Sequence, residues 1–187
     1  MAKRLFIAAD ISNEARKFAS NMIASLRADF PVNAVSWSKP ENLHITIKFL
    51  GETEEAAENR LIERLSSIAA SYQTFNLRLE KPEMLGKRVV SVAVRSDSPT
   101  VFSLEMVIDT ELVRLGFPRE GRRFHPHLTL ARIRQPEGTH LFTKRFLKTQ
   151  IEPLSFDVRE IVLYESELRP GGSIYRKVDT FKLSASE

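Results

Sequence analysis

The sequence predicts an α+β fold in which antiparallel strands pack against amphipathic helices. Strand-like and helix-like segments alternate along the 187 residues, and this alternation fits either a parallel α/β sheet or an α+β fold. Two pairs of neighbouring strand segments are joined by short, turn-forming stretches typical of β-hairpins, which favours the antiparallel arrangement. The strand pattern His-x-Thr-x, with apolar x, also occurs twice. Two related lobes that face each other would account for this repeat.

The chain is expected to open with a strand and a long helix. Residues 3–11 are rich in apolar side chains, as in a buried strand, and Asp10 makes the run too short for a signal peptide or a membrane span. Ser12 is a suitable N-cap for the helix that follows, and Pro31 is expected to end it. The helix is predicted from apolar residues at helical spacing: Ala15, Phe18, Ala19, Met22, Ile23 and Leu26.

A second unit of strands and a helix follows. A short strand is expected at 35–37 and a longer one at 43–50, where apolar and polar residues alternate until Gly51 stops the strand. Thr53 is expected to cap the next helix. Its buried stripe is predicted from side chains at helical spacing: Leu61, Ile62, Leu65, Ile68, Ala69 and Tyr72.

The rest of the chain continues the alternation around the second His-x-Thr-x strand. Pro99 suits the first turn of a third helix, and the Arg-Pro-Gly-Gly stretch at 169–172 suits a turn between the last two strands. The remaining expected elements are strands at 75–81, 88–95, 154–165 and 174–183, and helices at 99–115 and 139–149.

The composition is that of an ordinary globular protein with a mild excess of positive charge. Hydrophobic residues make up 42% of the chain and charged residues 28%, and the length fits one domain or two small lobes that share a core. The net charge of +4 and the pI near 9.5 are compatible with a polyanionic ligand. Cysteine is absent, which excludes disulfides and thiolate metal sites. Since this absence suits a reducing cytosol, we expect a cytoplasmic protein without a membrane anchor.

The repeated strand pattern is the strongest functional signal in the sequence. It occurs as His-Ile-Thr-Ile from His44 and as His-Leu-Thr-Leu from His127, and 127 − 44 gives an offset of 83 residues. Side chains alternate between the two faces of a strand, so His44 and Thr46 share one face, as do His127 and Thr129. A single pair fits a half-exposed strand with its polar side in solvent. Two copies, which use two of the four histidines, indicate a catalytic site.

Two imidazoles and two hydroxyls across a cleft suit hydrolysis of a phosphodiester without a metal or other cofactor. One neutral histidine takes a proton from the attacking water, and one protonated histidine gives a proton to the leaving alkoxide. The reference pKa of histidine, ~6.5, suits both roles. Threonine hydroxyls donate hydrogen bonds to the nonbridging phosphate oxygens. In-line displacement places the base and the acid on opposite sides of phosphorus, a geometry that two lobes related by an approximate twofold axis would supply.

Two other kinds of site remain open. His125 and His127 are two residues apart on one strand, and with His44 they would give three imidazole ligands for zinc, although no His-Glu-x-x-His signature is present. Alternatively, the basic run at 119–123 would grip phosphates in an RNA-binding module without turnover. Such a module does not require two His-x-Thr sets, because arginine and lysine bind phosphate better. The basic run also fits a solvated loop.

Beyond the two motifs, the chain resembles the two-histidine phosphoesterase superfamily, and most closely its RNA 2′,3′-cyclic phosphodiesterase branch, also described as 2′-5′ RNA ligases. The resemblance spans nearly the whole chain, and both motifs are intact. Four stretches carry it, in this order: RLFIAADI at 4–11, WSKPENLHITIKFLGE at 37–52, LGFPREGRRFHPHLTLAR at 115–132 and IVLYESELRPGGSIY at 161–175.

The resemblance implies that residues 1–187 form one bilobal domain with pseudo-twofold symmetry, in which antiparallel sheets line a central cleft and helices lie outside. It also implies hydrolysis of a 2′,3′-cyclic phosphate at an RNA end to a 2′-phosphomonoester, with His44 as proton donor and His127 as proton acceptor. The expected partner is RNA with such an end, or a related nucleotide, and no obligate protein partner is evident. Reversible 2′-5′ ligation remains open, because ligation and hydrolysis are microscopic reverses.

Four further residues are expected to contact the substrate. Phe49 and Arg132 each lie five residues after a motif histidine, and we predict that they sandwich the nucleobase, because aromatic rings and guanidinium planes stack on RNA bases. Since five is an odd offset, a bulge or twist has to turn both side chains into the cleft. Lys48, at an even offset, is expected on the catalytic face as a phosphate or base contact. His125 is expected at the rim of the cleft.

Overall fold

The computed structural model describes residues 2–29, 34–169 and 172–185. The expected helix end at Pro31 and the middle of the expected turn at 169–172 therefore lie outside the described residues. The described strands are β1 (Lys3–Asp10), β2 (Val35–Trp37), β3 (His44–Thr53), β4 (Phe75–Leu85), β5 (Val89–Arg95), β6 (His127–Ile133), β7 (Leu154–Val158), β8 (Glu160–Arg169) and β9 (Gly172–Lys182). They form one curved sheet in the order β7-β4-β5-β6-β3-β1-β8-β9, with β2 paired to β6. All neighbouring strands are antiparallel, which confirms the predicted α+β class.

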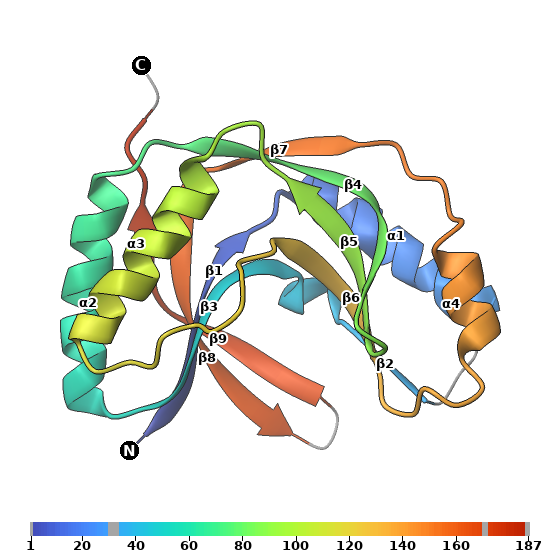
Figure 1. Ribbon diagram of the computed structural model, residues 1–187, viewed down its shortest axis with the longest axis horizontal. Helices are drawn as coiled ribbons and strands as arrows, with labels where there is room; N and C mark the ends of the chain where they lie inside the picture. Colours follow the sequence, from blue (N-terminus) through green and yellow to red (C-terminus); the bar gives the residue numbers. More distant parts are fainter. Residues whose placement is uncertain (1, 30–33, 170–171, 186–187) are drawn as a thin grey trace.

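The helices lie outside the sheet in two groups (Figure 1). They are α1 (Asn13–Asp29), α2 (Glu55–Ala70), α3 (Thr100–Arg114) and α4 (His140–Phe146), with a short 3-10 turn, η1, at Pro40–Asn42. α2 and α3 pack together and contact β9 and β3, while α1 contacts β7 at the other end of the sheet, where α4 also lies. Among the described residues, no helix is long and apolar enough to cross a membrane.

Strand β1 is buried on both faces, which explains its unbroken apolar sequence. Leu5 and Ile7 belong to the core between the sheet and the helices. Phe6 faces the other side, yet only 2% of its surface is exposed. Tyr164 of β8 and Tyr175 of β9 cover it, with ring centroids 5.2 Å and 4.9 Å away. The β8–β9 hairpin therefore shields this half of the concave face.

Strands β3 and β6, which carry the repeated pattern, lie side by side at the centre of the sheet. They run antiparallel and pair at Ile45 and Leu128, the same position of the two motifs. On the outer sides, Asp10 of β1 lies opposite the first motif histidine, and Ala93 of β5 lies opposite the second. Ala93 follows Asp10 by 83 residues, and His127 follows His44 by the same 83 residues. An approximate twofold operation between β3 and β6 therefore relates the two halves of the sheet.

Each of these two central strands contains a β-bulge three residues after its histidine. Ile47 has no partner on β1, because Thr46 and Lys48 pair with consecutive residues of that strand. Leu130 is skipped by β5 in the same way. A bulge disturbs the alternation of faces, because two consecutive residues then point to the same side. The side chains that follow each bulge therefore exchange faces.

A second irregularity lets β3 run further than expected. Leu50 has no partner on β1 between Phe49 and Gly51. Gly51 adopts a φ of 76°, which glycine accommodates without strain, and the strand continues to Thr53. The prediction that Gly51 ends the strand is therefore wrong. Thr53 is a strand residue and Glu54 occupies the N-cap position of α2, so the expected Thr53 cap is also wrong.

Two other expected elements differ from the structure. The apolar run at 154–165 is divided at Arg159 into β7 and β8, which belong to opposite halves of the sheet. Strand periodicity continues across this point, so the pattern does not reveal the division. In addition, β4 extends through Pro82 to Leu85. Proline is tolerated there because β7 pairs only with the first part of β4, which leaves Pro82 beyond the end of that pairing.

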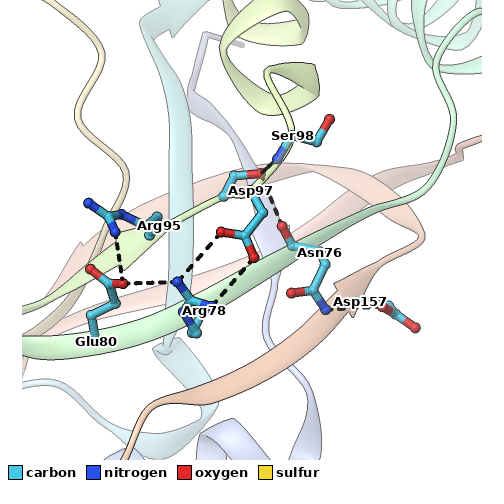
Figure 2. A network of polar contacts seen from close by, with 8 residues as sticks. Asn76, Arg78, Glu80, Arg95, Asp97, Ser98 and Asp157 are labelled. Atoms are coloured by element: carbon cyan, nitrogen blue, oxygen red, sulfur yellow. Dashed lines mark hydrogen bonds and ion pairs between the residues drawn. The ribbon is translucent and has the colours of Figure 1, made fainter.

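A network of polar side chains covers the solvent side of β4 and β5 near the edge of the sheet (Figure 2). Arg78 lies 3.2 Å from Glu80 and 3.4 Å from Asp97, and Arg95 lies 3.6 Å from Glu80. Asn76 donates a hydrogen bond to a carboxylate of β7. The network connects three strands, although exposed ion pairs of this kind contribute only about 0–1 kcal/mol each.

Candidate active site

The two His-x-Thr pairs face one cleft on the side of the sheet opposite the core. The cleft has a volume of about 480 Å³, and His44, Thr46, His127 and Thr129 all line it. The structure therefore brings together the four residues that the repeated pattern singled out. Other residues along its walls include Arg4, Phe6, Trp37, Lys39, Asn42, Phe49, Arg132, Leu168, Ser173 and Tyr175.

Backbone carbonyl groups orient both imidazoles. Nδ1 of His44 lies 2.7 Å from the carbonyl oxygen of Asn42, and Nδ1 of His127 lies 2.8 Å from that of His125. A carbonyl oxygen can only accept, so Nδ1 carries a proton in both rings. Nε2 is then the free base of each neutral imidazole, or the acidic N–H of each imidazolium. Nε2 of His44 lies 2.9 Å from Oγ1 of Thr46, within hydrogen-bond distance of that hydroxyl.

His44 is packed in an aromatic pocket that opposes its protonation. Its ring centroid lies 4.9 Å from that of Phe6 and 5.4 Å from that of Tyr175. This burial lowers the pKa of His44 to about 4, although the hydrogen bond to Asn42 and the carboxylate of Asp10 act in the opposite direction. Without an anionic ligand beside it, His44 is therefore neutral at pH 7.

The pKa of His127 is also lowered, mainly by burial. The hydrogen bond to the carbonyl of His125 and the carboxylate of Glu83 raise this pKa, whereas the imidazole of His125 and the guanidinium of Arg132 lower it. The two histidines differ in their surroundings, because the described residues form no aromatic pocket around His127 like that of His44; the ring of His125 lies 6.3 Å from that of His127. The twofold relation therefore holds for the motif residues and not for the side chains around them.

Asp10 connects the aromatic pocket to β8 and β9. Its carboxylate accepts a hydrogen bond from the hydroxyl of Tyr164 and forms an ion pair with Lys177 at 2.7 Å. Burial and then this hydrogen bond raise the pKa of Tyr164, so the phenol remains a donor. Sequence reasoning missed Asp10, Phe6 and Tyr175, because no motif marks them. The pairing of β1 with β3 and β8 would have been needed to find them.

Phe49 and Arg132 both line the cleft, although each lies at an odd offset from its motif histidine. The bulges at Ile47 and Leu130 account for this placement, because each shifts the alternation by one residue. Phe49 is 53% exposed, which is unusual for a phenylalanine and leaves its ring accessible to a ligand. Since β3 and β6 are antiparallel, the two side chains approach the cleft from opposite sides of the point where these strands pair.

Lys48 does not face the cleft, so the expected phosphate or base contact is wrong. The bulge at Ile47 turns it to the helix side, where its side chain is 2% exposed. Its Nζ lies 2.6 Å from Oδ1 of Asp109 in α3 and 2.9 Å from the carbonyl oxygen of Pro118. The same carboxylate oxygen accepts a hydrogen bond from the backbone N–H of Glu120 at 2.9 Å. This buried ion pair holds the loop after α3 against β3.

His125 lies beside the second motif histidine, with its ring centroid 6.3 Å from that of His127. Its Nε2 lies 2.6 Å from Oε1 of Glu83 on β4, and the ring is not among those that line the cleft. The expected contact of His125 with the substrate therefore stays a prediction, which the cleft lining does not support. Across the described residues, no group of three or more histidine, aspartate or glutamate side chains is arranged to hold a metal ion.

The basic run at 119–123 is engaged with acidic groups of its own loop and of α3. Arg119 lies 3.5 Å from Asp109, and Arg122 lies 3.4 Å from Glu120. Neither of these arginines lines the cleft. The position of these arginines therefore fits a solvent-exposed loop better than a surface that binds phosphate groups beside the motif histidines.

Known proteins share both the sequence and the fold of this chain. The family model described as the 2′-5′ RNA ligase superfamily matches residues 13–169. Proteins named RNA 2′,3′-cyclic phosphodiesterase from Methanothermobacter thermautotrophicus and Escherichia coli are 33% and 29% identical to the chain. These matches cover 98% and 97% of this chain, and 100% and 97% of the relatives.

Comparison with solved structures shows that the fold is also shared with known phosphoesterases. The crystal structure of E. coli LigT complexed with 3′-AMP superimposes with a TM-score of 0.75 at 29% identity, covering 98% of this chain and 99% of that one. A crystal structure described as a phosphoesterase gives a TM-score of 0.78 at 28% identity, with coverage of 98% and 99%. Because the family model spans most of the chain and the relative from Methanothermobacter thermautotrophicus matches along its full length, this protein belongs to the 2′-5′ RNA ligase superfamily.

Proposed function

We propose that this protein hydrolyses 2′,3′-cyclic phosphodiester ends of RNA to 2′-phosphomonoesters by metal-free acid/base catalysis. One observation carries the proposal: His44 and Thr46 on β3, and His127 and Thr129 on β6, line one cleft from equivalent positions. Both imidazoles keep Nδ1 bonded to a carbonyl, which leaves Nε2 for proton transfer. The name shared by the curated relatives, RNA 2′,3′-cyclic phosphodiesterase, supports the choice of substrate.

In the proposed reaction, Nε2 of His127 accepts a proton from a water molecule while the water oxygen attacks phosphorus. The bond between phosphorus and O3′ breaks, and Nε2–H of His44 gives its proton to the leaving O3′. The product carries a 3′-hydroxyl and a 2′-phosphate. The attacking and leaving oxygens lie in line, so a base and an acid from opposite halves of the cleft suit this geometry.

The two threonine hydroxyls stabilise the charge that develops on the nonbridging oxygens. Thr46 and Thr129 share the cleft with the histidines, and a preorganised hydroxyl donor is effective in a site that excludes water. Oγ1 of Thr46 already lies within hydrogen-bond distance of Nε2 of His44. When a phosphate oxygen replaces Nε2 as the hydrogen-bond partner of this hydroxyl, Thr46 donates to the phosphate oxygen. Nε2–H of His44 is then free to donate to O3′.

The substrate itself supplies the charge that the acid requires. Burial lowers the pKa of His44 to about 4, so the ring needs an adjacent negative charge to hold a proton at pH 7. A phosphodiester anion between the two histidines provides this charge, because an opposite charge within a few ångströms favours the protonated imidazole. The carboxylate of Asp10 acts in the same direction.

Phe49 and Arg132 are proposed to hold the nucleobase next to the cyclic phosphate. Both line the cleft, and they offer the ring and the guanidinium plane that stack on any base. A stacking site of this kind tolerates different RNA ends. The proposed partner is therefore RNA with a cyclic phosphate end, or a related nucleotide, in the cytoplasm, a location supported by the absence of cysteine.

Product analysis tests the proposal directly. The protein is incubated with EDTA and an oligonucleotide that ends in a 2′,3′-cyclic phosphate, and the terminal phosphate isomer is identified by ³¹P NMR. We expect a 2′-phosphate, at a rate that EDTA does not change. A 3′-phosphate would overturn the assigned leaving group, and a rate restored only by zinc would favour a metal site.

Two related activities are separated by the same assay. Addition of an oligonucleotide with a 5′-hydroxyl would yield a 2′-5′-linked product if the protein acts as a reversible ligase, because the hydroxyl replaces water as the partner of the cyclic phosphate. Binding of the cyclic end without any turnover would indicate an RNA-end-binding module and would overturn the proposed hydrolysis.

A further inference from the structure

The residues two positions before the motif histidines occupy equivalent places in the two halves. Asn42 precedes His44, and His125 precedes His127, so the two pairs share the offset that relates the two motifs. The carbonyl oxygen of each accepts the Nδ1–H of its histidine, at 2.7 Å and 2.8 Å. Each carbonyl therefore sets the tautomer and the ring orientation on which proton transfer at Nε2 depends.

The side chains of these two residues are tied to distant strands. Nδ2 of Asn42 donates a hydrogen bond to the carbonyl oxygen of Ser173 on β9, at 2.8 Å. Nε2 of His125 lies 2.6 Å from the carboxylate of Glu83 on β4. The chemistry differs, since one contact joins an amide to a carbonyl and the other joins an imidazole to a carboxylate. The arrangement is the same, because each residue is held at a hairpin of its own half.

Such anchors are needed because neither residue lies in a strand. Asn42 is the last residue of η1, and β3 begins only at His44. His125 lies in the loop before β6, which begins at His127. The hydrogen-bond ladder of the sheet therefore does not hold either carbonyl group. A carbonyl that moved away would allow the imidazole to rotate or to place its proton on Nε2, and a neutral ring in that form cannot act as a base there.

We propose that Asn42 and His125 are positioning residues, and that their side-chain contacts with Ser173 and Glu83 fix the carbonyl groups that orient the two catalytic imidazoles. The inference deepens the proposed function, since it concerns the same histidines. It assigns His125 a role through His127 rather than through the substrate. Enzymes lose up to about 10²-fold in rate when a catalytic group is misplaced by 1 Å, so loss of either anchor has a measurable effect on turnover.

The first test removes the anchor of His44. We expect Asn42→Ala to lower kcat for a 2′,3′-cyclic phosphate by about 10- to 100-fold. Because Asn42 also lines the cleft, KM is measured separately: a positioning role lowers kcat and leaves KM nearly unchanged, whereas a direct substrate contact raises KM. Asn76→Ala is the matched control: it makes the same chemical change at an amide that contacts β7 (Figure 2) and does not line the cleft. It should keep the wild-type kcat.

The second test separates two effects of Glu83 on His127: the hydrogen bond that anchors His125, and the negative charge of the carboxylate. Glu83→Ala removes the acceptor of His125 and is expected to lower kcat by about 10- to 100-fold. Glu83→Gln keeps an acceptor oxygen at the same place and should restore most of the rate. Glu80→Ala, on the same strand but within the exposed network of Figure 2, is the control. Equal rates for the Ala and Gln variants of Glu83 would overturn an anchoring role and assign the effect to charge.

A readout that does not depend on turnover distinguishes this inference from the proposed function. The ¹⁵N chemical shifts of labelled imidazoles at pH 7 report whether the proton sits on Nδ1 or Nε2. We expect His44 to be in the Nδ1–H form in the wild type and in a mixture of both forms in Asn42→Ala. If the shifts and kcat of Asn42→Ala match the wild type, or if Asn76→Ala loses kcat equally, the positioning role is wrong. If the wild type turns over no cyclic phosphate, the proposed function fails while the tautomer test still stands.

Discussion

Ile47 and Leu130 occupy the same place in the two halves of the sheet: each is the extra residue of a β-bulge, three positions after a motif histidine. The bulge lets two consecutive residues face the helices before the next side chain returns to the cleft. On β3 this turns Lys48 toward α3 and Phe49 into the cleft, and on β6 it turns Arg132 into the cleft. The two bulges therefore decide which side chains can meet a substrate.

Removal of either imidazole should abolish most turnover. We expect His44→Ala and His127→Ala each to lower kcat by about 10²–10⁴-fold, because positioned general acid or base catalysis contributes about that much. The rates are measured on an oligonucleotide with a cyclic phosphate end, with circular dichroism to verify the fold. His140→Ala is the control, since His140 is exposed at the start of α4 and does not line the cleft. A wild-type rate for His44→Ala would rule out the two-histidine mechanism.

Loss of either threonine hydroxyl should slow the chemical step. Thr46→Val and Thr129→Val keep the β-branched shape but remove the donor, and removal of one such donor lowers kcat by about 10²–10³-fold in a well-studied oxyanion site. We expect a smaller but clear decrease in kcat, because two hydroxyls share the phosphate. Thr100→Val, at the start of α3, provides a threonine control outside the cleft. Unchanged rates in both Thr46→Val and Thr129→Val would show that the two threonines have no catalytic role and are only polar residues on the solvent-exposed face of their strands.

Acid should destabilise the fold through His44. Burial lowers its pKa to about 4, whereas the unfolded chain has a value of about 6.5. Between these values the unfolded state binds the proton and the folded state does not, so the contribution of neutral His44 is complete above pH ~6.5 and is lost as the pH falls toward about 4. The loss amounts to at most about 3 kcal/mol.

Urea unfolding between pH 4 and pH 7 measures this effect. The matched variant is His44→Phe, which keeps an aromatic ring beside Phe6 and Tyr175 but does not titrate. Its free energy of unfolding should decrease less with falling pH than that of the wild type. Parallel pH profiles for the two proteins would mean that His44 is not the group responsible.

Local patterns were sufficient to predict most of the elements and the faces of the motif histidines and threonines. The alternation of apolar residues predicted that His44 and Thr46 share one face of their strand, and that His127 and Thr129 share one face of theirs. The structure places all four along one cleft. The hairpin-like connections likewise predicted an antiparallel sheet. These features depend on neighbours in the chain, which a sequence displays directly.

Features set by distant pairing escaped prediction. Nothing in the residues around Ile47 indicates that it is left unpaired by β1. Without this bulge, Lys48 was predicted to lie on the wrong face of β3. In the same way, Asp10 and Tyr175 come from opposite ends of the chain, and only the order β3-β1-β8-β9 brings them to His44. The register between strands, rather than the pattern within one strand, decides these contacts.

The buried ion pair between Lys48 and Asp109 should be a large contributor to stability. Asp109→Ala leaves the ammonium buried without its carboxylate, and such a loss typically destabilises a protein by about 3–5 kcal/mol. The double variant Lys48→Met with Asp109→Leu should recover part of this stability, because apolar side chains of similar size replace a buried pair but leave the carbonyl of Pro118 and the N–H of Glu120 without these partners. Urea unfolding of the wild type and of both variants measures the difference.

Ion pairs on the solvent side of the sheet supply the comparison for that experiment. Arg78→Ala removes two pairs on β4, with Glu80 and with Asp97 (Figure 2), and should change the free energy of unfolding by no more than about 1 kcal/mol per pair. Equal losses for Asp109→Ala and Arg78→Ala would show that burial does not distinguish the pair of Lys48 from those of Arg78.

Phe49 and Arg132 should determine how tightly the protein holds a nucleoside. Phe49→Leu and Arg132→Ala each remove a stacking surface from the cleft, and base stacking contributes about 1–3 kcal/mol per base. We expect both variants to bind a nucleoside 2′-phosphate more weakly and inorganic phosphate nearly as well as the wild type, as measured by calorimetry. Phe102→Leu and Arg64→Ala are matched changes on the outer helices, away from the cleft. Because the two residues reach the cleft from opposite sides, a sandwich requires losses in both cleft variants. Equal losses for nucleotide and phosphate, or no loss for either ligand, would exclude it.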